Sequence, residues 1–168
     1  VAEAAKELDY DFFVNIQGDE PLIKVTDIQK AITAKKINYK KVVNCYTTVT
    51  EKEAVSRNVI KMAIKPDSEL LYASRSLIPG TKTGVSDKLY KQVCIYVFTK
   101  PELDLFADSE KTANEWYEDI EILRFIEKNY PVYMTRVSSN SAAVDTEDDL
   151  NCKGAYECSK KLNLLQNK

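Results

Sequence analysis

Residues 11–23 read DFFVNIQGDEPLI, in which an apolar run passes directly into two adjacent carboxylates and a proline. Residues 11–16 are β-branched or aromatic and have polar neighbours, a pattern that predicts a short buried strand. The segment TDIQKAITAKKI follows and places Thr26 and Gln29 at capping-box spacing, so we expect a helix to begin near Thr26. The GDE turn therefore connects the carboxyl end of a strand to a helix.

The remaining chain alternates predicted strands with predicted helices. We expect strands at 42–49, 59–64, 70–74, 93–98 and 131–137, an acidic turn at 51–58, a loop at 75–88, and helices at 100–107, 115–128 and 146–165. Within 115–128, the apolar residues Trp116, Ile120, Leu123 and Ile126 recur at helical spacing. The alternation predicts one α/β domain over residues 1–168, built on a mostly parallel mixed sheet with helices on both faces.

Composition excludes several classes of function. A formal net charge of -2, without a basic stripe, argues against a nucleic-acid partner, because nucleic-acid binding depends on neutralising phosphates. The chain has no histidine, which excludes a Ser-His-Asp triad, an HExxH zinc site and an imidazole proton shuttle. Apolar runs such as VCIYVF are too short to insert into a membrane, and no signal-peptide core is visible, so we expect a cytoplasmic protein with reduced cysteines.

Carboxylates follow two of the predicted strands. Ligands of open α/β sheets bind beyond the carboxyl ends of strands, where this chain has Asp19 and Glu20 in one loop and Asp145 in another. Two carboxylates about 4 Å apart repel by roughly 4 kcal/mol, and a divalent cation reverses that cost. Oxygen-only ligands suit Mg²⁺. The alternative is that these acids are only turn and helix-cap residues, although Asp145 lies before the cap at Thr146 and has no local role.

Five segments carry a resemblance to a known family. In order, VNIQGDEPLI, LLYASRSLIPG, VCIYVF, NEWYEDIEILRFIEKN and AAVDTEDDL resemble the 3-deoxy-manno-octulosonate cytidylyltransferases (CMP-Kdo synthetases) over most of residues 10–160. These enzymes join CTP to an acidic keto-sugar and release pyrophosphate, giving a CMP-sugar for lipopolysaccharide or capsule. The resemblance implies a Rossmann-like fold of the nucleotide-diphospho-sugar transferase type and a homodimer.

The resemblance also implies roles for individual residues. Asp19 and Asp145 correspond to the catalytic Mg²⁺ ligands of the family, and Gln17 corresponds to a residue that contacts the bound substrates. Arg75, in YASRS, corresponds to the arginine that meets the sugar acid, a role that suits a planar cation facing a carboxylate. Without the family, a solvated loop cation is the simpler interpretation of Arg75.

The sugar pocket departs from the family pattern. In KQVCIY the family has a histidine and a glycine where this chain has Gln92 and Cys94, and in EDIEILR it has a glutamine where this chain has Ile122. Tyr96 and Glu121 match family residues of the same pocket, so Gln92, Tyr96 and Glu121 remain candidates for substrate binding. A half-buried strand tyrosine and an exposed helix acid are the simpler interpretations of Tyr96 and Glu121.

A second departure concerns the nucleotide. Family members begin with a Gly-rich loop that holds the triphosphate, and this chain starts at Val1 without one. We therefore expect the sequence to be the C-terminal portion of a sugar nucleotidyltransferase domain and to be inactive alone. Two alternatives stay open: a glycosyltransferase of similar fold that uses a nucleotide-sugar, and a non-catalytic fragment.

Overall fold

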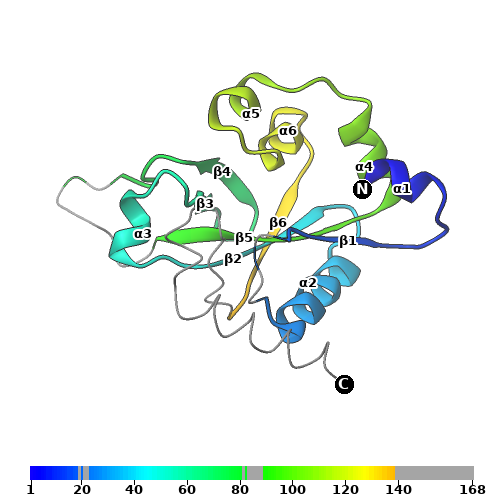
Figure 1. The fold of residues 1–168 in the computed structure, drawn as a ribbon, viewed down its shortest axis with the longest axis horizontal. Coiled ribbons are helices and arrows are strands. Elements are labelled where there is room, and N and C mark those ends of the chain that lie inside the picture. Colours follow the sequence, from blue (N-terminus) through cyan, green and yellow to red (C-terminus); the bar gives the residue numbers. More distant parts are fainter. Residues whose placement is uncertain (19, 21–22, 81, 83–88, 139–168) are drawn as a thin grey trace, which may run out of the picture.

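The computed structural model describes residues 1–18, 20, 23–80, 82 and 89–138, and these form one mixed sheet with helices on both sides (Figure 1). The described strands run in the order β4-β3-β5-β2-β6, and β1 pairs with β5 beside that path. Their bounds are β1 Phe13–Ile16, β2 Val42–Thr48, β3 Lys61–Ile64, β4 Leu70–Ser74, β5 Tyr90–Phe98 and β6 Val132–Arg136. The α/β fold and the mixed sheet are thereby confirmed.

The expected mostly parallel character is wrong for the described strands. Only β2 and β6 pair in parallel, whereas β1–β5, β2–β5, β3–β4 and β3–β5 are antiparallel. Hydrophobic periodicity shows which face of a strand is buried, but it does not show the direction of the strand. The direction of β3 and β4 comes from their tight turn, in which Lys65 N donates to Glu69 O at 2.8 Å and Ser68 has a φ of 68°.

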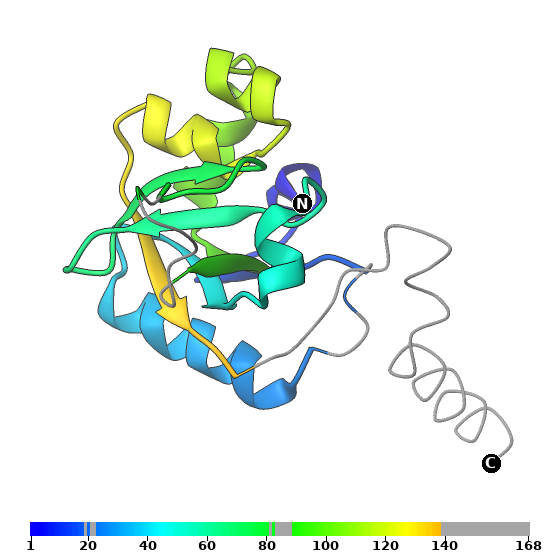
Figure 2. The same cartoon turned by 90° about the vertical axis from the view of Figure 1, so that its left-hand side faces the viewer.

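Helices cover both faces of the sheet, as expected. On one face lies α2 (Val25–Ile37), and the other face carries α1 (Ala2–Lys6), α4 (Lys100–Ala107), α5 (Ala113–Glu118) and α6 (Ile122–Glu127) (Figure 2). Each face has its own core: Ala31 of α2 packs with Val43 and Val93, whereas Leu123 of α6 packs with Val42 and Met62. The two cores place the strands between two apolar layers.

The predicted helix at 115–128 is two helices. Asp119 adopts a left-handed conformation with φ 53°, which ends α5 and separates it from α6. Of the apolar residues at helical spacing, Trp116 is 69% exposed, whereas Ile120 is 3% exposed. The break occurs where Arg75, distant in the sequence, donates hydrogen bonds to the carbonyls of Glu118 and Asp119. A long-range contact of this kind leaves no mark on local periodicity.

Two other local expectations also need correction. Residues 51–58, expected as a turn, contain the helix α3 (Glu51–Val55), capped by Thr50 and Glu53 in a capping box. Helix α2 begins one residue before Thr26, and its N-cap Lys24 makes no side-chain capping bond. Thr26 and Gln29 therefore do not form the predicted capping box.

One ion pair is wholly enclosed between α2 and α4. Lys35 and Glu102 each have 0% side-chain exposure, and Lys35 Nζ lies 2.7 and 2.6 Å from the two carboxylate oxygens. Glu102 also accepts from Thr99 N and Tyr130 Oη, and Lys35 donates to Lys41 O. Burial lowers the pKa of Lys35, and its bond to Glu102 opposes that shift. Both carboxylate oxygens of this pair have partners.

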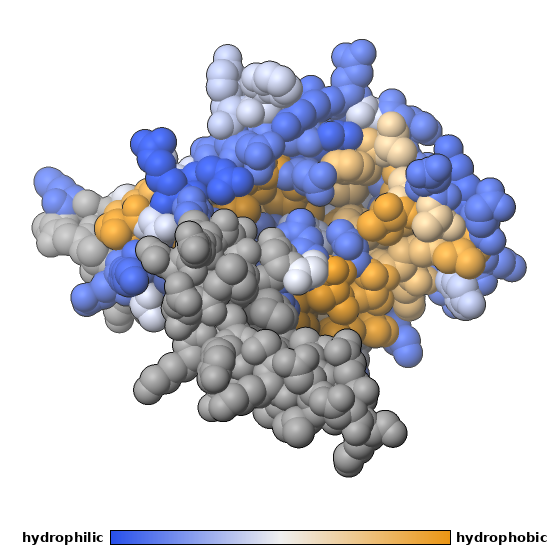
Figure 3. Space-filling model, viewed as in Figure 1, coloured by the Kyte–Doolittle hydropathy of each residue, from blue (hydrophilic) through white to orange (hydrophobic). Residues whose placement is uncertain are grey.

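The surface of the described residues varies from side to side. Apolar colour gathers where α1 and β1 lie, and hydrophilic colour covers most of the region of α5 and α6 (Figure 3). Val14 and Ile16 of β1 are 37% and 40% exposed. Among the described helices, none has the length and hydropathy of a membrane span. The predicted helix at 146–165 lies outside the described residues.

Candidate functional site

Two strands separate along one edge of β5 and leave a gap. Strand β1 pairs with β5 from Ile95 to Phe98, and β3 pairs with its first two residues. Between them, Cys94 O accepts from Gln17 N at 3.3 Å, and Cys94 N donates to Glu20 Oε1 at 2.7 Å. We call Gln17, Glu20, Gln92 and Cys94 the fork. Gln17 and Glu20 are thus attached to the middle of β5 within this gap.

A bulge in the pairing of β2 with β5 shapes the fork. Asn44 lies opposite Tyr96, but the next residue of β2 lies opposite Val93, so β5 has extra residues at this point. The side chain of Asn44 donates to Val93 O at 3.2 Å and to Ile95 O at 3.0 Å, and it accepts from Gln92 Nε2 at 2.9 Å. Bulges of this kind redirect side chains beside functional sites. Asn44, which the sequence did not single out, holds this bulge.

Two buried oxygens of the fork have no hydrogen-bond partner. Within the described part of the chain, Glu20 Oε2 and Gln92 Oε1 are the buried side-chain atoms without one, and their residues are only 6% and 8% exposed. Buried polar atoms in folded proteins are nearly always satisfied, so an unpaired acceptor calls for a ligand, a cation or a water. The fork therefore presents two acceptor oxygens for which the described residues supply no donor.

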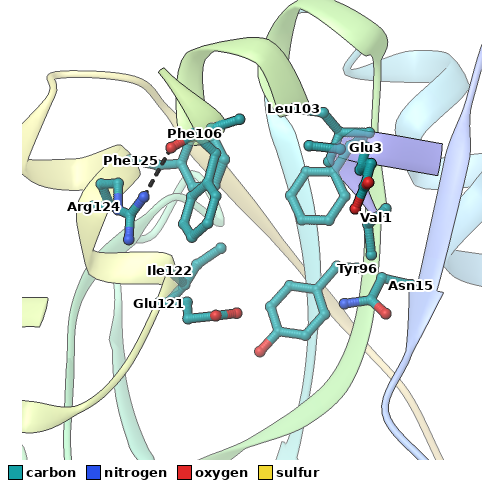
Figure 4. A pocket seen from close by; sticks show the side chains of 13 residues that line it. Val1, Glu3, Asn15, Tyr96, Leu103, Phe106, Glu121, Ile122, Arg124 and Phe125 are labelled. Carbon is teal, nitrogen blue, oxygen red and sulfur yellow. Dashed lines mark hydrogen bonds between the residues drawn. The ribbon is translucent and has the colours of Figure 1, made fainter. Parts of the chain in front are cut away.

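A cavity of about 430 Å³ lies between the sheet and helices α4 and α6 (Figure 4). Tyr96 and Asn15 reach it from the sheet and Glu121 reaches it from the start of α6, while Phe106 and Phe125 form an aromatic wall. Burial raises the pKa of Tyr96 well above its usual value, and its neighbour Cys94 and the charge of Glu121 raise it further. Tyr96 therefore stays a neutral phenol that can donate or accept a hydrogen bond.

Arg124 also lines the cavity, but its guanidinium is already occupied. Its Nε and Nη2 each lie 2.6 Å from a carboxylate oxygen of Glu115, and its Nη1 donates to Phe106 O and Ser109 O. The bonds to Glu115 raise the pKa of Arg124. This arginine stabilises the wall of the cavity and is not arranged to bind an anion.

Arg75 lies at the end of β4, away from the cavity lining. Its guanidinium donates to three backbone carbonyls, from Nε to Glu118 O at 2.6 Å, from Nη2 to Asp119 O at 3.1 Å and from Nη1 to Arg57 O at 3.2 Å. Two of the five guanidinium N–H groups have no partner among the described residues. The side chain is therefore held in place and still has donors to offer.

The structure divides the predicted site residues into three groups. Tyr96 and Glu121 line the cavity, and Gln17 and Gln92 belong to the fork. Arg75 belongs to neither group. Its guanidinium donates to the carbonyls of Glu118 and Asp119, at the turn between α5 and α6 that precedes Glu121. Asp19 and Asp145 lie outside the described residues. Their predicted pairing therefore stays a prediction. Among the described residues there is no group of three or more His, Cys, Asp or Glu side chains that could hold a metal ion.

Known protein sequences resemble this chain over most of its length. A sequence model of the family described as Cytidylyltransferase matches residues 1–140. A 3-deoxy-manno-octulosonate cytidylyltransferase of Koribacter versatilis is 30% identical over 151 residues, which are 89% of this chain and 58% of the relative. The enzyme of the same name from Geotalea uraniireducens is 34% identical over 163 residues, 89% of this chain and 65% of the relative. The chain thus spans less than two thirds of these relatives.

Solved structures share the fold. A CMP:2-keto-3-deoxy-manno-octonic acid synthetase complexed with CTP superposes with a TM-score of 0.85 at 23% identity, covering 95% of this chain and 66% of that one. The inositol-1-phosphate CTP transferase of T. maritima has a TM-score of 0.63 at 14% identity, covering 95% of this chain and 59% of that one. These likenesses confirm the expected Rossmann-like nucleotidyltransferase architecture.

Proposed function

Because the chain belongs to the cytidylyltransferase family, we propose that the complete protein joins CTP to an acidic keto-sugar, 3-deoxy-manno-octulosonate or a related sugar acid, and releases pyrophosphate. The observation that carries this proposal is the fork, where Glu20 of the QGDEP sequence and Gln92 of β5 each have a buried oxygen without a partner among the described residues. The names of the relatives support a sugar acid as the acceptor. The product would be a CMP-sugar of the kind used for lipopolysaccharide or capsule.

In the proposed reaction, the anomeric hydroxyl of the sugar attacks the α-phosphorus of CTP in line with the departing pyrophosphate. Such transfers depend on positioning and on charge neutralisation rather than on a covalent protein intermediate. The chain supplies rigid placement: Gln17 and Glu20 are bonded to β5 through Cys94, and Tyr96 stands beside them as a neutral phenol. A histidine-free chain is compatible with this chemistry.

We propose Mg²⁺ as the cofactor, held by Asp19 and Asp145. The donor set fits this ion, because it consists of oxygen ligands and because Glu20, next to Asp19 in the sequence, has a buried carboxylate oxygen without a partner. When bound, Mg²⁺ would neutralise charge on the phosphates.

Arg75 is our candidate for the carboxylate of the sugar acid. Its two remaining N–H groups belong to a planar, permanently charged guanidinium, whose geometry matches that of a carboxylate. Glu121 and Tyr96 line the cavity that would receive the hydroxyl groups of the sugar. Gln92, whose Oε1 lacks a donor, would accept a hydrogen bond from a substrate.

The decisive experiment measures pyrophosphate release by the full-length protein with CTP, Mg²⁺ and a panel of sugar acids. We expect release only when CTP and a sugar acid are both present, and we expect Asp19→Asn to abolish it while the far-ultraviolet circular dichroism stays unchanged. Asp9→Asn, a change at an exposed acid before β1, is the matched control. Equal activity of Asp19→Asn and wild type would remove Asp19 from the site. Hydrolysis of a CMP-sugar without an acceptor would favour the glycosyltransferase alternative.

We also propose that the complete protein is a homodimer. The segment VCIYVF cannot form the contact through most of its side chains, because all of its described residues except Cys94 are buried within the sheet. Helix α5 remains a candidate, since Trp116 and Tyr117 are 69% and 84% exposed. Light scattering during size-exclusion chromatography should give twice the mass of the chain, and Tyr117→Glu should shift it toward the single mass. A monomer in the wild type would refute this proposal.

A further inference from the structure

We infer that Glu118 is the positioning residue for Arg75: it fixes the backbone and the guanidinium of that arginine at once, and so acts on sugar-acid binding without touching the substrate. This inference rests on the proposed function only for the contact between Arg75 and the sugar acid. The placement of Arg75 by Glu118 rests on hydrogen bonds within the described chain.

The first contact is made by the carboxylate of Glu118. Its Oε1 accepts from Ser74 Oγ at 2.7 Å, and its Oε2 accepts from the backbone N–H of Arg75 at 2.9 Å. Ser74 is only 2% exposed, and its hydroxyl oxygen also accepts from Ser76 N at 3.0 Å. The carboxylate thus holds the end of β4 at the residue from which the Arg75 side chain departs.

The second contact is made by the backbone carbonyls of Glu118 and the next residue, Asp119. Glu118 O and Asp119 O accept from Arg75 Nε and Nη2 at 2.6 and 3.1 Å. The left-handed φ of 53° at Asp119 ends α5 at this point, where the last carbonyls of a helix lack partners within the helix. Arg75 therefore satisfies carbonyls that the end of α5 leaves open, and those carbonyls orient the plane of its guanidinium.

The backbone carbonyl of Arg75 is held by the side chain of Lys61. The buried ammonium of Lys61 donates to Arg75 O, and it also donates to Ser56 O and Val59 O. With Glu118 on the amide and Lys61 on the carbonyl, the peptide groups on both sides of Arg75 are fixed. Only the last N–H groups of the guanidinium are left for another molecule.

This arrangement connects Arg75 to the cavity. Glu121, which points into the cavity, follows Glu118 by three residues, and between them Ile120 is 3% exposed in the core (Figure 4). Because Glu118 and Ile120 anchor this turn, the positions of Arg75 and Glu121 relative to each other are fixed. Preorganised groups of this kind bind a ligand without first losing side-chain freedom, so loosening the turn should weaken binding.

The test compares Glu118→Ala, Glu118→Gln and Arg75→Lys in the full-length protein, alone and combined. We expect Glu118→Ala to raise the KM for the sugar acid about tenfold, with the KM for CTP and kcat changed less than about threefold. Glu118→Gln should restore near wild-type values, because an amide can accept from Arg75 N and donate to Ser74 Oγ. Glu110→Ala, at an exposed acid between α4 and α5, is the control. Thermal melts establish that each variant is folded.

The double variant decides whether Glu118 acts through Arg75. In that case, adding Glu118→Ala to Arg75→Lys should raise the sugar-acid KM by less than about twofold beyond Arg75→Lys alone. Independent, multiplying effects would overturn the inference, as would an equal rise of both KM values in Glu118→Ala.

A measurement that needs no turnover separates this inference from the proposed function. The Nε–H proton of Arg75, assigned in nuclear magnetic resonance spectra by its loss in Arg75→Lys, should exchange with water about tenfold faster in Glu118→Ala and at nearly the wild-type rate in Glu118→Gln. Unchanged exchange in Glu118→Ala would overturn the positioning role. If the wild type releases no pyrophosphate with any sugar acid, the proposed function fails and the exchange rates still decide the role of Glu118.

Discussion

The carboxylates of Glu102 and Glu20 are both buried, yet their surroundings differ. Glu102 has 0% exposure and accepts from Lys35 through both oxygens, from Thr99 N and from Tyr130 Oη. Glu20 has 6% exposure, accepts from Cys94 N through one oxygen, and has no partner for the other. We therefore call Lys35 and Glu102 the closed pair, because both carboxylate oxygens of Glu102 have partners. The carboxylate of Glu20 is open, because one of its oxygens has no partner among the described residues.

The difference separates stability from binding. Leaving a buried acceptor unsatisfied costs about 1 to 3 kcal/mol, and more for a charged group. Glu102 receives several donors, whereas one oxygen of Glu20 receives none from the described residues, so the two buried carboxylates differ in their local surroundings. We therefore expect changes at the closed pair to affect folding and changes at the fork to affect activity.

The largest expected effect is at the closed pair. Lys35→Met removes the cation and leaves Glu102 enclosed without its charge partner, which should lower the free energy of unfolding by about 3 to 5 kcal/mol. Urea denaturation followed by circular dichroism measures this loss. Lys36→Met, at the exposed next residue of α2, should change it by less than about 0.5 kcal/mol. Similar losses in both variants would contradict the distinction.

A smaller effect is expected where the fork joins the sheet. Asn44→Ala removes the donors to Val93 O and Ile95 O and leaves Gln92 Nε2 without its acceptor, so it should cost about 1 to 3 kcal/mol. Urea denaturation again gives the value, with Thr48→Ala at an exposed position of the same strand as the control. A cost near zero would mean that the bulge does not depend on this side chain.

The open carboxylate should give the clearest contrast. Glu20→Gln keeps an oxygen that accepts from Cys94 N and replaces the unpartnered oxygen with the amide NH2. The free energy of unfolding should therefore change by less than about 1 kcal/mol. Pyrophosphate release by the full-length protein should nevertheless fall about 10- to 100-fold. A loss of stability as large as that of Lys35→Met, with activity retained, would reverse our assignment of the fork.

The smallest effect depends on pH and lies in the capping box of α3. Burial acts to raise the pKa of Glu53, but its bonds from Lys91 and Thr50 outweigh burial and lower it below the usual 4.5. A lowered pKa in the folded state gives stability that is present above pH 4.5 and is lost as the pH falls through the folded value. The difference in melting temperature between wild type and Glu53→Gln should therefore shrink below that pH. A constant difference from neutral to acid pH would contradict this.

Local patterns predicted most of the elements, because apolar periodicity reports which residues face a core. They could not predict contacts between distant segments. Helical spacing predicted one helix through Trp116 and Ile120, but the left-handed Asp119 ends α5 between them, where Arg75 donates to the carbonyls of Glu118 and Asp119, and Trp116 is exposed. The prediction of a mostly parallel sheet was likewise wrong, because strand direction depends on the turns and on the order of the strands.

The candidate site was predictable in part. Tyr96 and Glu121 came from the resemblance, and the structure places both at one cavity. Asn44 and Glu118 gave no sequence signal, because each acts through bonds to residues more than forty positions away. Glu20 was visible as an acid after a strand, but only burial shows that one of its oxygens lacks a partner.

The single tryptophan of the chain provides a built-in optical reporter. The indole of Trp116 is exposed and lies under the Lys111 ammonium, which is 5.1 Å from the ring centroid and also pairs with Asp119. Its fluorescence emission therefore reports little about the apolar interior and much about the turn between α5 and α6, to which Arg75 donates hydrogen bonds. Fluorescence titration with a sugar acid would follow occupancy without any attached dye.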